Sequence, residues 1–288
     1  MAAERSGKMY DFAVLGGDLR QFYMAKQLAF KGYSVITYGI ASGEVQASSM
    51  KEAVENAEIL VGPIPFSKDR ENLVSMECCA DFGIEDVKRH LRKGQKIFAG
   101  CIPDDFCHYC MNTGVAVHDF MKLDSVALKN AVPTAEGAVA EAVFDSPVQI
   151  QGSRCLVTGF GRRGSVLAEK LKLWSAKVTA AARNKEQRAL AESFGMKAVS
   201  LDELKEELSQ ADFIFNTIPA MILDRERLEQ VKKEALIVDI ASAPGGVDFR
   251  AADELGINAK QCLGIPGKYA ACSAAAILTE TMITEWDV

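Results

Sequence analysis

Three glycines near the middle of the chain are spaced so that the backbone can approach phosphate groups closely. Gly159, Gly161 and Gly164 follow the apolar run Cys155–Val157 and precede Ser165–Leu171, which has helical spacing. A strand that turns through Gly-x-Gly-x-x-Gly into a helix is typical of a dinucleotide-binding βαβ unit, because the helix N–H groups face the diphosphate. Gly159 allows the tight turn, Gly161 lacks the Cβ that would block a pyrophosphate, and Gly164 lets helix and strand pack closely. The predicted diphosphate-binding residues are Gly159, Phe160, Gly161, Arg162, Arg163 and Gly164.

An arginine after the next predicted strand indicates which dinucleotide binds. The strand Lys177–Ala181 is followed by Arg183 and Asn184, about 20 residues beyond the last glycine, where an NAD site usually carries Asp or Glu for the ribose 2′-hydroxyl. A guanidinium instead attracts a 2′-phosphate and can bind it through two hydrogen bonds. We therefore predict NADP(H) as the cofactor, with Arg183 and Asn184 at the adenosine ribose. The alternative is that Arg183 is only a solvated residue at the end of a strand.

Two later strands are expected to border the nicotinamide half of this site. Ala211–Thr217 is a predicted strand that ends in Ile218 and Pro219, and Ala235–Ser242 is the next strand along the chain. Ligands of parallel sheets bind at the carboxyl ends of the strands. The residues predicted at these ends are Thr217, Ile218, Pro219, Asp239 and Ala241.

Composition limits the classes of partner. The chain has 288 residues, of which 49% are hydrophobic and 25% charged, which suits two domains of ordinary size. Its net charge of −6 argues against nucleic acid or an acidic membrane as a main partner. Met1–Lys8 carries no apolar segment behind its charges, so no signal peptide is expected, and no apolar run is long enough to span a membrane. We expect a cytoplasmic protein.

The eight cysteines do not form a recognisable disulfide framework. Cys101 and Cys155 lie in or beside apolar runs, where a reduced thiol behaves as a small hydrophobic group. Cys107 and Cys110 have the spacing of a zinc or redox pair, but no second CxxC accompanies them and Pro103–Asp105 precedes them as it would an ordinary helix. We predict no metal site.

Predicted strands alternate with helical patterns along the whole chain, which indicates parallel sheets covered on both faces. We predict an α/β fold of two Rossmann-like, doubly wound domains joined by crossing helices. The expected parts are a flavodoxin- or Rossmann-like substrate domain (1–130), an inter-domain helix and linker (131–151), an NADP-binding Rossmann domain (152–268), and a C-terminal helix (269–288) that returns to the first domain. Pro133 and Thr134 mark the expected start of the inter-domain helix.

The first domain offers a second helix start with bare glycines. Gly16 and Gly17 end the predicted strand Asp11–Gly17, Asp18 is a plausible N-cap for Leu19–Phe30, and Arg20 follows it. This arrangement lacks a third glycine, but it suits a carboxylate on a small substrate. A tight turn whose Arg20 points into water is the alternative.

The layout resembles the two-domain dehydrogenases of the formate and glycerate class. Those enzymes use a His–carboxylate pair and an arginine on the cofactor domain. All three histidines of this chain, His90, His108 and His118, lie in the first predicted domain, so the resemblance does not extend to that catalytic set.

A resemblance over nearly the whole chain is to the dipicolinate synthase A-subunit family. The segments that carry it are Val14–Gln21, Val132–Gly137, Gly159–Arg162, Asn216–Leu223 and Asp239–Gly246. It implies NADP-dependent oxidation of dihydrodipicolinate to dipicolinate (pyridine-2,6-dicarboxylate) in the mother cell of a spore-forming bacterium, together with a flavoprotein-like B subunit. The chain departs from the family where a lysine, here Lys268, is displaced relative to the Pro-Gly of Ile265–Gly267.

On this interpretation the substrate is a small cyclic dicarboxylate, whose carboxylates need cations or helix N-termini. The candidates are Arg20, Lys268 and the N–H groups around Thr134, and Glu136 is a candidate base. Glu136 could equally be a partner of the helix dipole, and Lys268 a solvated loop residue. Two alternatives stay open: a shikimate-dehydrogenase-like NADP enzyme, and a non-catalytic NADP-binding subunit of the synthase. A homodimer is expected by analogy with related dehydrogenases.

Overall fold

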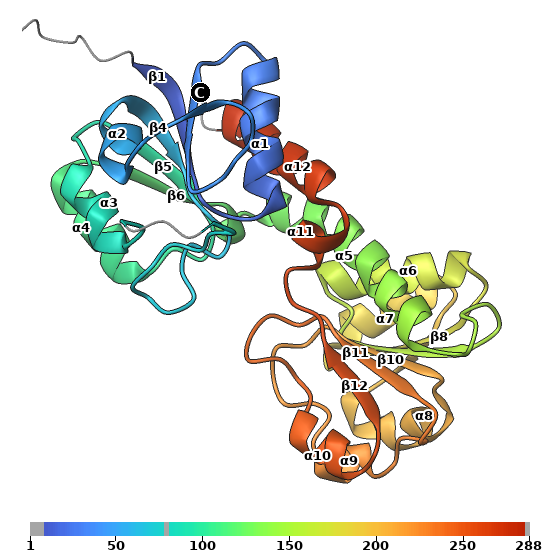
Figure 1. The fold of residues 1–288 in the computed structure, drawn as a ribbon. Helices are drawn as coiled ribbons and strands as arrows, with labels where there is room; N and C mark the ends of the chain where they lie inside the picture. The colour runs from blue at the N-terminus through green and yellow to red at the C-terminus, as the bar shows by residue number, and fades with distance from the viewer. Residues whose placement is uncertain (1–8, 78–80, 286–288) are drawn as a thin grey trace, which may run out of the picture. The chain divides into compact units, whose positions relative to one another are not determined.

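The computed structural model describes residues 9–77 and 81–285. The segment Met1–Lys8, for which no signal peptide was expected, lies outside the described residues. The chain divides into two compact units (Figure 1): residues 1–127 with 271–288, and residues 128–270.

The first unit contains a six-stranded sheet in which every pairing is parallel. Its strands are β1 (Tyr10–Leu15), β2 (Val35–Tyr38), β3 (Val45–Gln46), β4 (Ala57–Val61), β5 (Lys96–Ala99) and β6 (Ala116–Asp119). Their order, β3-β2-β1-β4-β5-β6, is the doubly wound order of dinucleotide-binding folds rather than that of flavodoxin. The helices are α1 (Leu19–Phe30), α2 (Met50–Glu55), α3 (Ile84–His90), α4 (Asp104–Thr113), α12 (Ala271–Glu285) and the 3₁₀ helix η1 (Phe120–Lys122).

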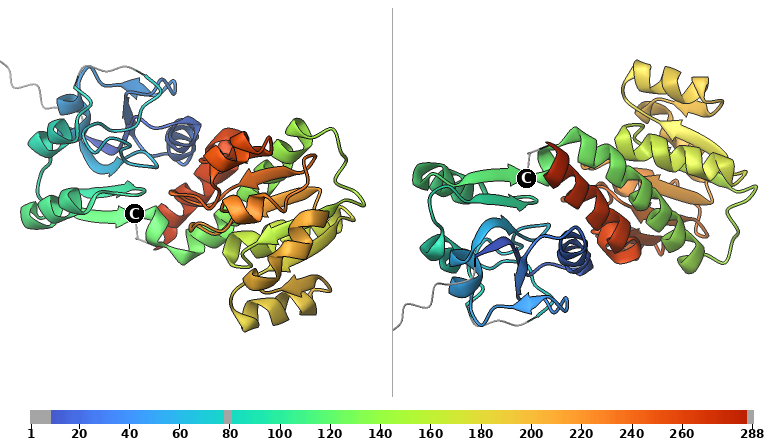
Figure 2. Two further views of the ribbon diagram at one scale, coloured as in Figure 1. Left: turned by 90° about the horizontal axis from the view of Figure 1, so that it is seen from below. Right: turned by 90° about the horizontal axis from the view of Figure 1, so that it is seen from above.

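Helix α1 begins and ends where the sequence predicts. Asp18 accepts a hydrogen bond from the N–H of Arg20, and a capping box with Gln21 satisfies further donors of the first turn. The buried face of α1 packs on α12, and the two helices lie side by side in both views of Figure 2. Their shared apolar residues are Met24, Ala25, Leu28, Ala275, Leu278 and Met282.

The second unit repeats this architecture, which confirms the predicted fold class. Its parallel sheet has the order β12-β11-β10-β7-β8-β9, so β7 and β10 stand where the two halves of the sheet meet. The strands are β7 (Arg154–Thr158), β8 (Lys177–Ala181), β9 (Lys197–Val199), β10 (Phe213–Asn216), β11 (Leu236–Asp239) and β12 (Asn258–Gln261). The helices wholly within this unit are α6 (Arg162–Leu173), α7 (Lys185–Ser193), α8 (Leu204–Gln210), α9 (Arg225–Leu228), α10 (Phe249–Glu254), α11 (Ile265–Tyr269) and the 3₁₀ helix η2 (Leu201–Glu203).

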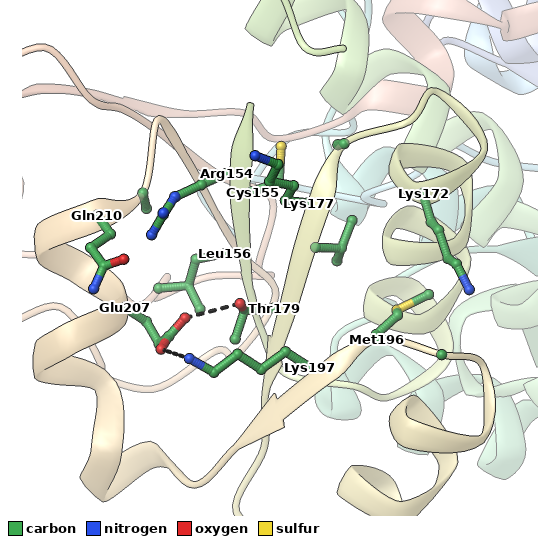
Figure 3. Close-up of a pocket in the computed structure, with 14 residues that line it drawn as sticks. Arg154, Cys155, Leu156, Lys172, Lys177, Thr179, Met196, Lys197, Glu207 and Gln210 are labelled. Carbon is green, nitrogen blue, oxygen red and sulfur yellow. Dashed lines mark hydrogen bonds and ion pairs between the residues drawn. The ribbon is translucent and has the colours of Figure 1, made fainter. Parts of the chain in front are cut away.

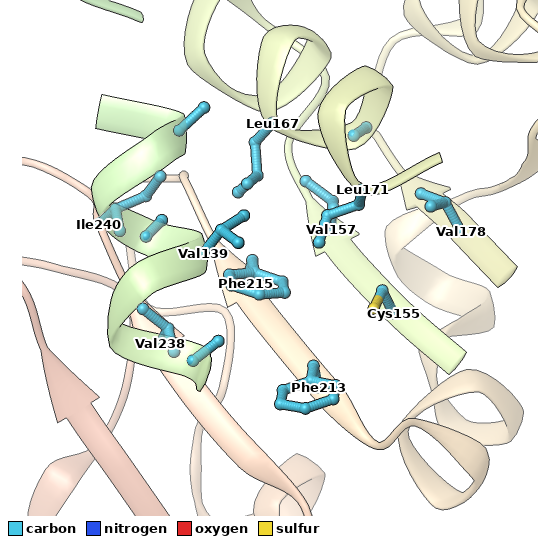
Figure 4. Packing of buried hydrophobic residues seen from close by; sticks show 14 of the residues in the cluster. Val139, Cys155, Val157, Leu167, Leu171, Val178, Phe213, Phe215, Val238 and Ile240 are labelled. Atoms are coloured by element: carbon cyan, nitrogen blue, oxygen red, sulfur yellow. The ribbon is translucent and has the colours of Figure 1, made fainter. Parts of the chain in front are cut away.

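One of the two hydrophobic cores of this unit lies between the sheet and helices α5 (Asp124–Asp145) and α6, and the other includes residues of α8, α9 and α10. Figure 4 shows Val139 and Leu167 close to the strand face that carries Phe213 and Phe215. These four side chains are at most 6% exposed. Deleting a buried aromatic of this kind costs about 3–5 kcal/mol, so the core holds α6, and with it the glycine turn, against the sheet.

The predicted start of the inter-domain helix is wrong. Helix α5 begins at Asp124 and contains Pro133 in its interior. A proline removes one intrahelical hydrogen bond, but Ala131, Ala135 and Ala138 are buried on either side of it, and this packing keeps the helix continuous. The hydroxyl of Thr134 donates to the Asn130 carbonyl at 2.7 Å. The N–H groups around Thr134 are therefore inside a helix, and no helix terminus exists there to bind an anion.

The cysteines remain thiols in the part of the chain that the structure describes: Cys101, Cys107, Cys110, Cys155, Cys262 and Cys272 are free. Burial raises the pKa of the Cys110 thiol to about 12, so it carries no thiolate at neutral pH. Among residues 9–77 and 81–285, no three His, Cys, Asp or Glu side chains are placed to hold a metal ion. Within the same residues, every helix is too short or too polar to cross a bilayer.

Candidate dinucleotide site in the second unit

The glycine turn lies at the carboxyl ends of β7 and β10, which pair with each other. From β7 the sheet continues to β8 and β9, and from β10 it continues in the other direction to β11 and β12. Ligands of doubly wound sheets bind at the point where the strand order reverses in this way. Gly159 leaves β7 with φ of +91°, a left-handed conformation that residues with a Cβ rarely adopt. The turn therefore needs glycine at its first position.

The three glycines differ in what a Cβ atom would meet. At Gly164 it would lie 2.0 Å from the Gly159 carbonyl oxygen, and at Gly159 it would lie 2.4 Å from Thr217 Oγ1. At Gly161, whose φ is an ordinary −88°, it would come within 4 Å of no atom in the described part of the chain. The protein's own packing thus requires two of the glycines. Gly161 instead leaves one side of the turn without a side chain, as close approach of a pyrophosphate requires.

The helix that follows the turn directs its N-terminus at the same place. Gly161 is the N-cap of α6, and the N–H of Ser165 makes the first intrahelical bond, to Gly161 O at 2.9 Å. The preceding N–H groups of the first turn face the glycine loop, where the helix dipole favours negative charge. Arg162 and Arg163 add positive charge, and the Arg163 guanidinium donates to Ser242 Oγ at 3.1 Å. These features fit a nucleotide diphosphate.

Beneath the turn, three fully buried polar side chains join the ends of three strands. Thr158 donates to Asn216 Oδ1 at 2.7 Å, and Asn216 donates to Asp239 Oδ1 at 2.8 Å. The Asp239 carboxylate also accepts from the N–H groups of Ala241 and Gly246, at 3.0 and 2.8 Å. These bonds occupy both oxygens of the buried carboxylate. Asp239 thus shapes the loop after β11, and direct contact of Asp239 or Ala241 with a cofactor stays a prediction.

Neighbouring residues of the predicted nicotinamide half are also held by this network. Thr217 Oγ1 donates to the Thr158 carbonyl at 2.9 Å, and the N–H of Ile218 donates to Asn216 Oδ1 at 3.2 Å. The loop that contains Thr217, Ile218 and Pro219 is thereby fixed beside Gly159. Asn216 carries no predicted role, although its position between a buried strand and this loop is a signal in the sequence.

The loop after β8 presents a cation that no described residue neutralises. Arg183 is exposed, and its guanidinium makes no hydrogen bond or ion pair with any residue in the described part of the chain. The loop itself is held in place, because Arg188 donates to the carbonyls of Ala182 and Arg183 at 2.8 and 2.9 Å. Asn184 caps α7 by accepting from the N–H of Gln187 at 3.0 Å. A guanidinium and a helix N-terminus thus lie together where a ribose phosphate is predicted.

Two predicted substrate residues of this unit are engaged in ion pairs. Glu136 pairs with Lys170 at 2.9 Å on the surface. Lys268 pairs at 2.6 Å with Glu141, which is 2% exposed and also pairs with Lys260 at 2.6 Å. Burial would raise the pKa of Glu141, but hydrogen bonds from Lys260 and Lys268 outweigh it and lower the pKa to about 2.

Arg20, the substrate candidate of the first unit, is also engaged by its neighbours. Its guanidinium is buried against Asp18, at 2.9 and 2.8 Å, and donates to the Ile64 carbonyl. The chain's own loop covers this sheet edge: a Cβ at Gly16 would lie 2.5 Å from Phe82 and 2.7 Å from the Val74 carbonyl. The edge equivalent to the dinucleotide site is therefore filled in the first unit.

A cavity of about 320 Å³ lies at the opposite edge of the second sheet. Figure 3 shows Arg154 and Lys177, which begin β7 and β8, with Glu207 bonded to Thr179 and Lys197. Ligands of doubly wound sheets bind at the carboxyl ends of the strands, so this cavity is separate from the predicted site.

Comparisons with known proteins agree with this geometry. Residues 127–248 match the family model of the D-isomer specific 2-hydroxyacid dehydrogenase NAD binding domain, and residues 11–121 match that of the N-terminal domain of the dipicolinate synthase A subunit. The transhydrogenase of Sinorhizobium meliloti, at 14% identity and a TM-score of 0.71 over 96% of this chain and 93% of that one, shares the fold. The protein is thus an oxidoreductase-type chain with an NAD-binding dehydrogenase domain.

More similar proteins are found among dipicolinate synthase A subunits. The dipicolinate synthase A subunit of Bacillus subtilis (strain 168) is 29% identical over 283 residues, which cover 94% of this chain and 93% of that protein. The crystal structure of the dipicolinate synthase A subunit from Bacillus halodurans has a TM-score of 0.87 at 25% identity, with 97% of each chain covered. The corresponding structure from Bacillus subtilis has 0.84 at 26%, with 98% of this chain and 96% of that one covered. The chain is thus similar to dipicolinate synthase A subunits over nearly its whole length.

The different roles of the glycines can be separated by substitution. We expect Gly161→Ala to leave the thermal unfolding temperature unchanged while weakening dinucleotide binding at least tenfold, because its Cβ meets only the space a pyrophosphate would use. Gly164→Ala should instead destabilise the fold by about 1–3 kcal/mol, through overlap with a backbone carbonyl. Differential scanning fluorimetry and calorimetric titration with NADP⁺ measure both effects. Normal binding by a folded Gly161→Ala protein would contradict the assignment.

The buried Glu141 cluster predicts a specific acid sensitivity. With its folded pKa at about 2 and an unfolded value near 4.5, Glu141 stabilises the second unit fully above pH 4.5 and loses this contribution as the pH falls towards 2. Glu141→Gln should cost about 3 kcal/mol at pH 7 and much less at pH 3, measured by urea unfolding. The matched control on the same helix, Glu136→Gln, removes an exposed pair and should cost less than about 1 kcal/mol at either pH. Equal losses for the two variants would refute the prediction.

Proposed function

We propose that the chain is the NADP-dependent subunit of a dipicolinate synthase, which oxidises dihydrodipicolinate to dipicolinate with a flavoprotein-like second subunit in the mother cell of a spore-forming bacterium. Its similarity to the A subunit of dipicolinate synthase over 94% of its length supports the substrate. The exposed Arg183 guanidinium, unpaired among the described residues, is the observation that carries the choice of NADP over NAD.

The reaction removes a hydride and a proton from a dihydropyridine ring. Bound NADP⁺ supplies the hydride acceptor, and formation of the aromatic pyridine ring drives the step forward. The chain's part is to position the reactants and to accept a proton. The α6 N-terminus, Arg162 and Arg163 hold the diphosphate, while Arg183 and Asn184 hold the 2′-phosphate. Thr217, Ile218 and Pro219 border the nicotinamide.

Lys268 and Arg20 remain the proposed cations for the substrate carboxylates, and Glu136 the proposed base. Side-chain exposure of Lys268 is 57%, so it retains donors for an anion while bonded to Glu141. Glu136 is 58% exposed and, among the described residues, is paired with Lys170 alone. In this proposal Thr134 contributes only its hydroxyl, because its backbone N–H lies in the interior of α5.

One observation favours a non-catalytic, NADP-binding subunit as the second candidate. Each proposed acid–base or anion-binding residue is already paired: Arg20 with Asp18, Glu136 with Lys170, and Lys268 with Glu141. Such a subunit, which binds the nucleotide and delivers substrate to its partner, would need none of them free.

An assay of the purified chain distinguishes these candidates. We expect the chain to form NADPH from NADP⁺ and dihydrodipicolinate, with dipicolinate as the product by ultraviolet absorbance. The same assay is run with and without the flavoprotein-like subunit, and with shikimate as the alternative substrate. NADPH formation that requires the partner, although the chain alone binds NADP⁺, would favour the non-catalytic role. Turnover of shikimate would displace dihydrodipicolinate as the substrate.

Arg183→Asp tests cofactor choice directly. A carboxylate repels the 2′-phosphate and can accept from the ribose 2′-hydroxyl, so we expect the preference for NADP⁺ over NAD⁺ to reverse, with NADP⁺ affinity falling about 100-fold. Lys177→Asp is the matched control, because Lys177 is an exposed cation at the opposite end of the same strand. Calorimetric titrations with both nucleotides give the ratio. An unchanged ratio in Arg183→Asp would remove the basis for NADP.

A further inference from the structure

A pocket of about 460 Å³ lies between α1 and α12 in the first unit. This volume is within the range of about 300–1,000 Å³ that is usual for small-molecule sites. Every residue that lines the pocket belongs to the first unit, whereas the glycine turn belongs to the second. The lining residues are Tyr23, Lys26, Gln27, Phe30, Lys31, Cys272, Ala276, Thr279 and Glu280.

Two lining residues carry a buried oxygen that has no hydrogen-bond partner among the described residues: Gln27 Oε1 and Thr279 Oγ1. The amide of Gln27 is held by its Nε2, which donates to the Cys272 carbonyl at 3.1 Å. On the helix of Thr279, the hydroxyls of Thr281 and Thr284 donate to the carbonyls four residues earlier, each at 2.7 Å. Thr279 is 1% exposed but makes no such bond. Because buried polar atoms in native proteins are nearly always hydrogen-bonded, these two indicate that the pocket receives a polar group.

Charged groups of both signs line the same pocket. Lys31 and Glu280 are exposed, and neither forms an ion pair with another residue in the described part of the chain. Lys26 adds a second cation, whose Nζ lies 5.2 Å from the centroid of the Phe22 ring. The pocket thus offers a positive and a negative group to a single ligand.

The rest of the lining suits a small apolar group. Phe30 is 93% exposed, and Tyr23 and Ala276 are partly buried. A protein surface laid over this place would bury Lys31 and Glu280, and charged residues are depleted from the centre of protein interfaces. A small molecule can instead pair with both charges at the edge of the pocket and leave them partly in water.

We propose that the α1–α12 pocket binds a free amino acid with an apolar side chain. Its ammonium group donates to Gln27 Oε1 and pairs with Glu280, while its carboxylate accepts from the Thr279 hydroxyl and pairs with Lys31. Its side chain packs against Phe30. The ligand joins two helices that are far apart in sequence, so it stabilises the first unit. This site does not depend on the reaction or the cofactor proposed above.

Calorimetric titration and thermal unfolding of the full chain test the class of ligand. The probes are L-leucine, L-methionine and L-phenylalanine, of which at least one should bind saturably and raise the unfolding temperature. The deaminated acid and the amide of that amino acid each lack one of its two charges. Both analogues should bind at least about tenfold more weakly. Failure of all three probes to bind, or equal affinity for either analogue, would overturn the proposal.

Two threonines of α12 give a matched pair of variants. Thr279→Val removes a hydroxyl that has no partner among the described residues, so it should weaken binding of the probe at least about tenfold without lowering the unfolding temperature of the chain alone. Thr281→Val is the control, because Thr281 is also buried but donates to the Ile277 carbonyl and does not line the pocket. It should keep the affinity for the probe. Unchanged affinity in Thr279→Val, or an equal loss in both variants, would contradict the assignment.

Alkylation of Cys272 reports where the probe binds. This exposed thiol lines the pocket, so a bound amino acid should slow its reaction with iodoacetamide. Cys101, an exposed thiol that follows β5, should react at an unchanged rate, and peptide mass spectrometry measures both thiols. Protection of Cys272 by the flavoprotein-like subunit but by none of the probes would refute the site. So would a crystal grown with the probe that shows only water beside Gln27 Oε1 and Thr279 Oγ1.

Discussion

The hydrogen bonds among Thr158, Asn216 and Asp239 are the constraint on which the dinucleotide site depends. These side chains end three adjacent strands, β7, β10 and β11, and have no exposure to solvent. Breaking a buried network of this kind leaves donors or acceptors without partners, at about 1–3 kcal/mol for each group. The geometry of this network fixes the position at which the chain leaves β7 at Gly159. It also fixes the course of the loop after β11 through the N–H groups of Ala241 and Gly246. The loops predicted to meet the cofactor are thus positioned by polar groups that need not touch it.

Much of this fold could be predicted because local patterns and global architecture agree. Alternating strands and helices indicated two doubly wound sheets, and Asp18 marked the start of α1 to the residue. The start of α5 could not be read in the same way, because Pro133 signals a helix terminus locally while the buried alanines around it act through tertiary packing. The two-residue strand β3 is too short to show periodicity.

In the candidate site, too, features set by local sequence spacing could be predicted, whereas features set by tertiary contacts could not. The glycine turn and Arg183 are readable because their spacing in sequence is fixed by one βαβ unit. Glu141 and Lys260 are 119 residues apart in sequence, and their ion pair depends on where α5 meets β12. No pattern in a single sequence reports such a contact. The partners of Arg20, Glu136 and Lys268 were likewise invisible, and these partners decide how much of each side chain is left for a substrate.

The filled edge of the first sheet has a consequence for stoichiometry. Both sheets have the strand order that creates a nucleotide crevice, but Phe82 and the Val74 backbone lie where the first would open. One loop therefore separates two otherwise equivalent scaffolds, and on the proposed function we expect saturation with a single equivalent of dinucleotide per polypeptide. On that function each turnover would move one electron pair per chain, and the redox capacity of an assembly would grow only with the number of its subunits.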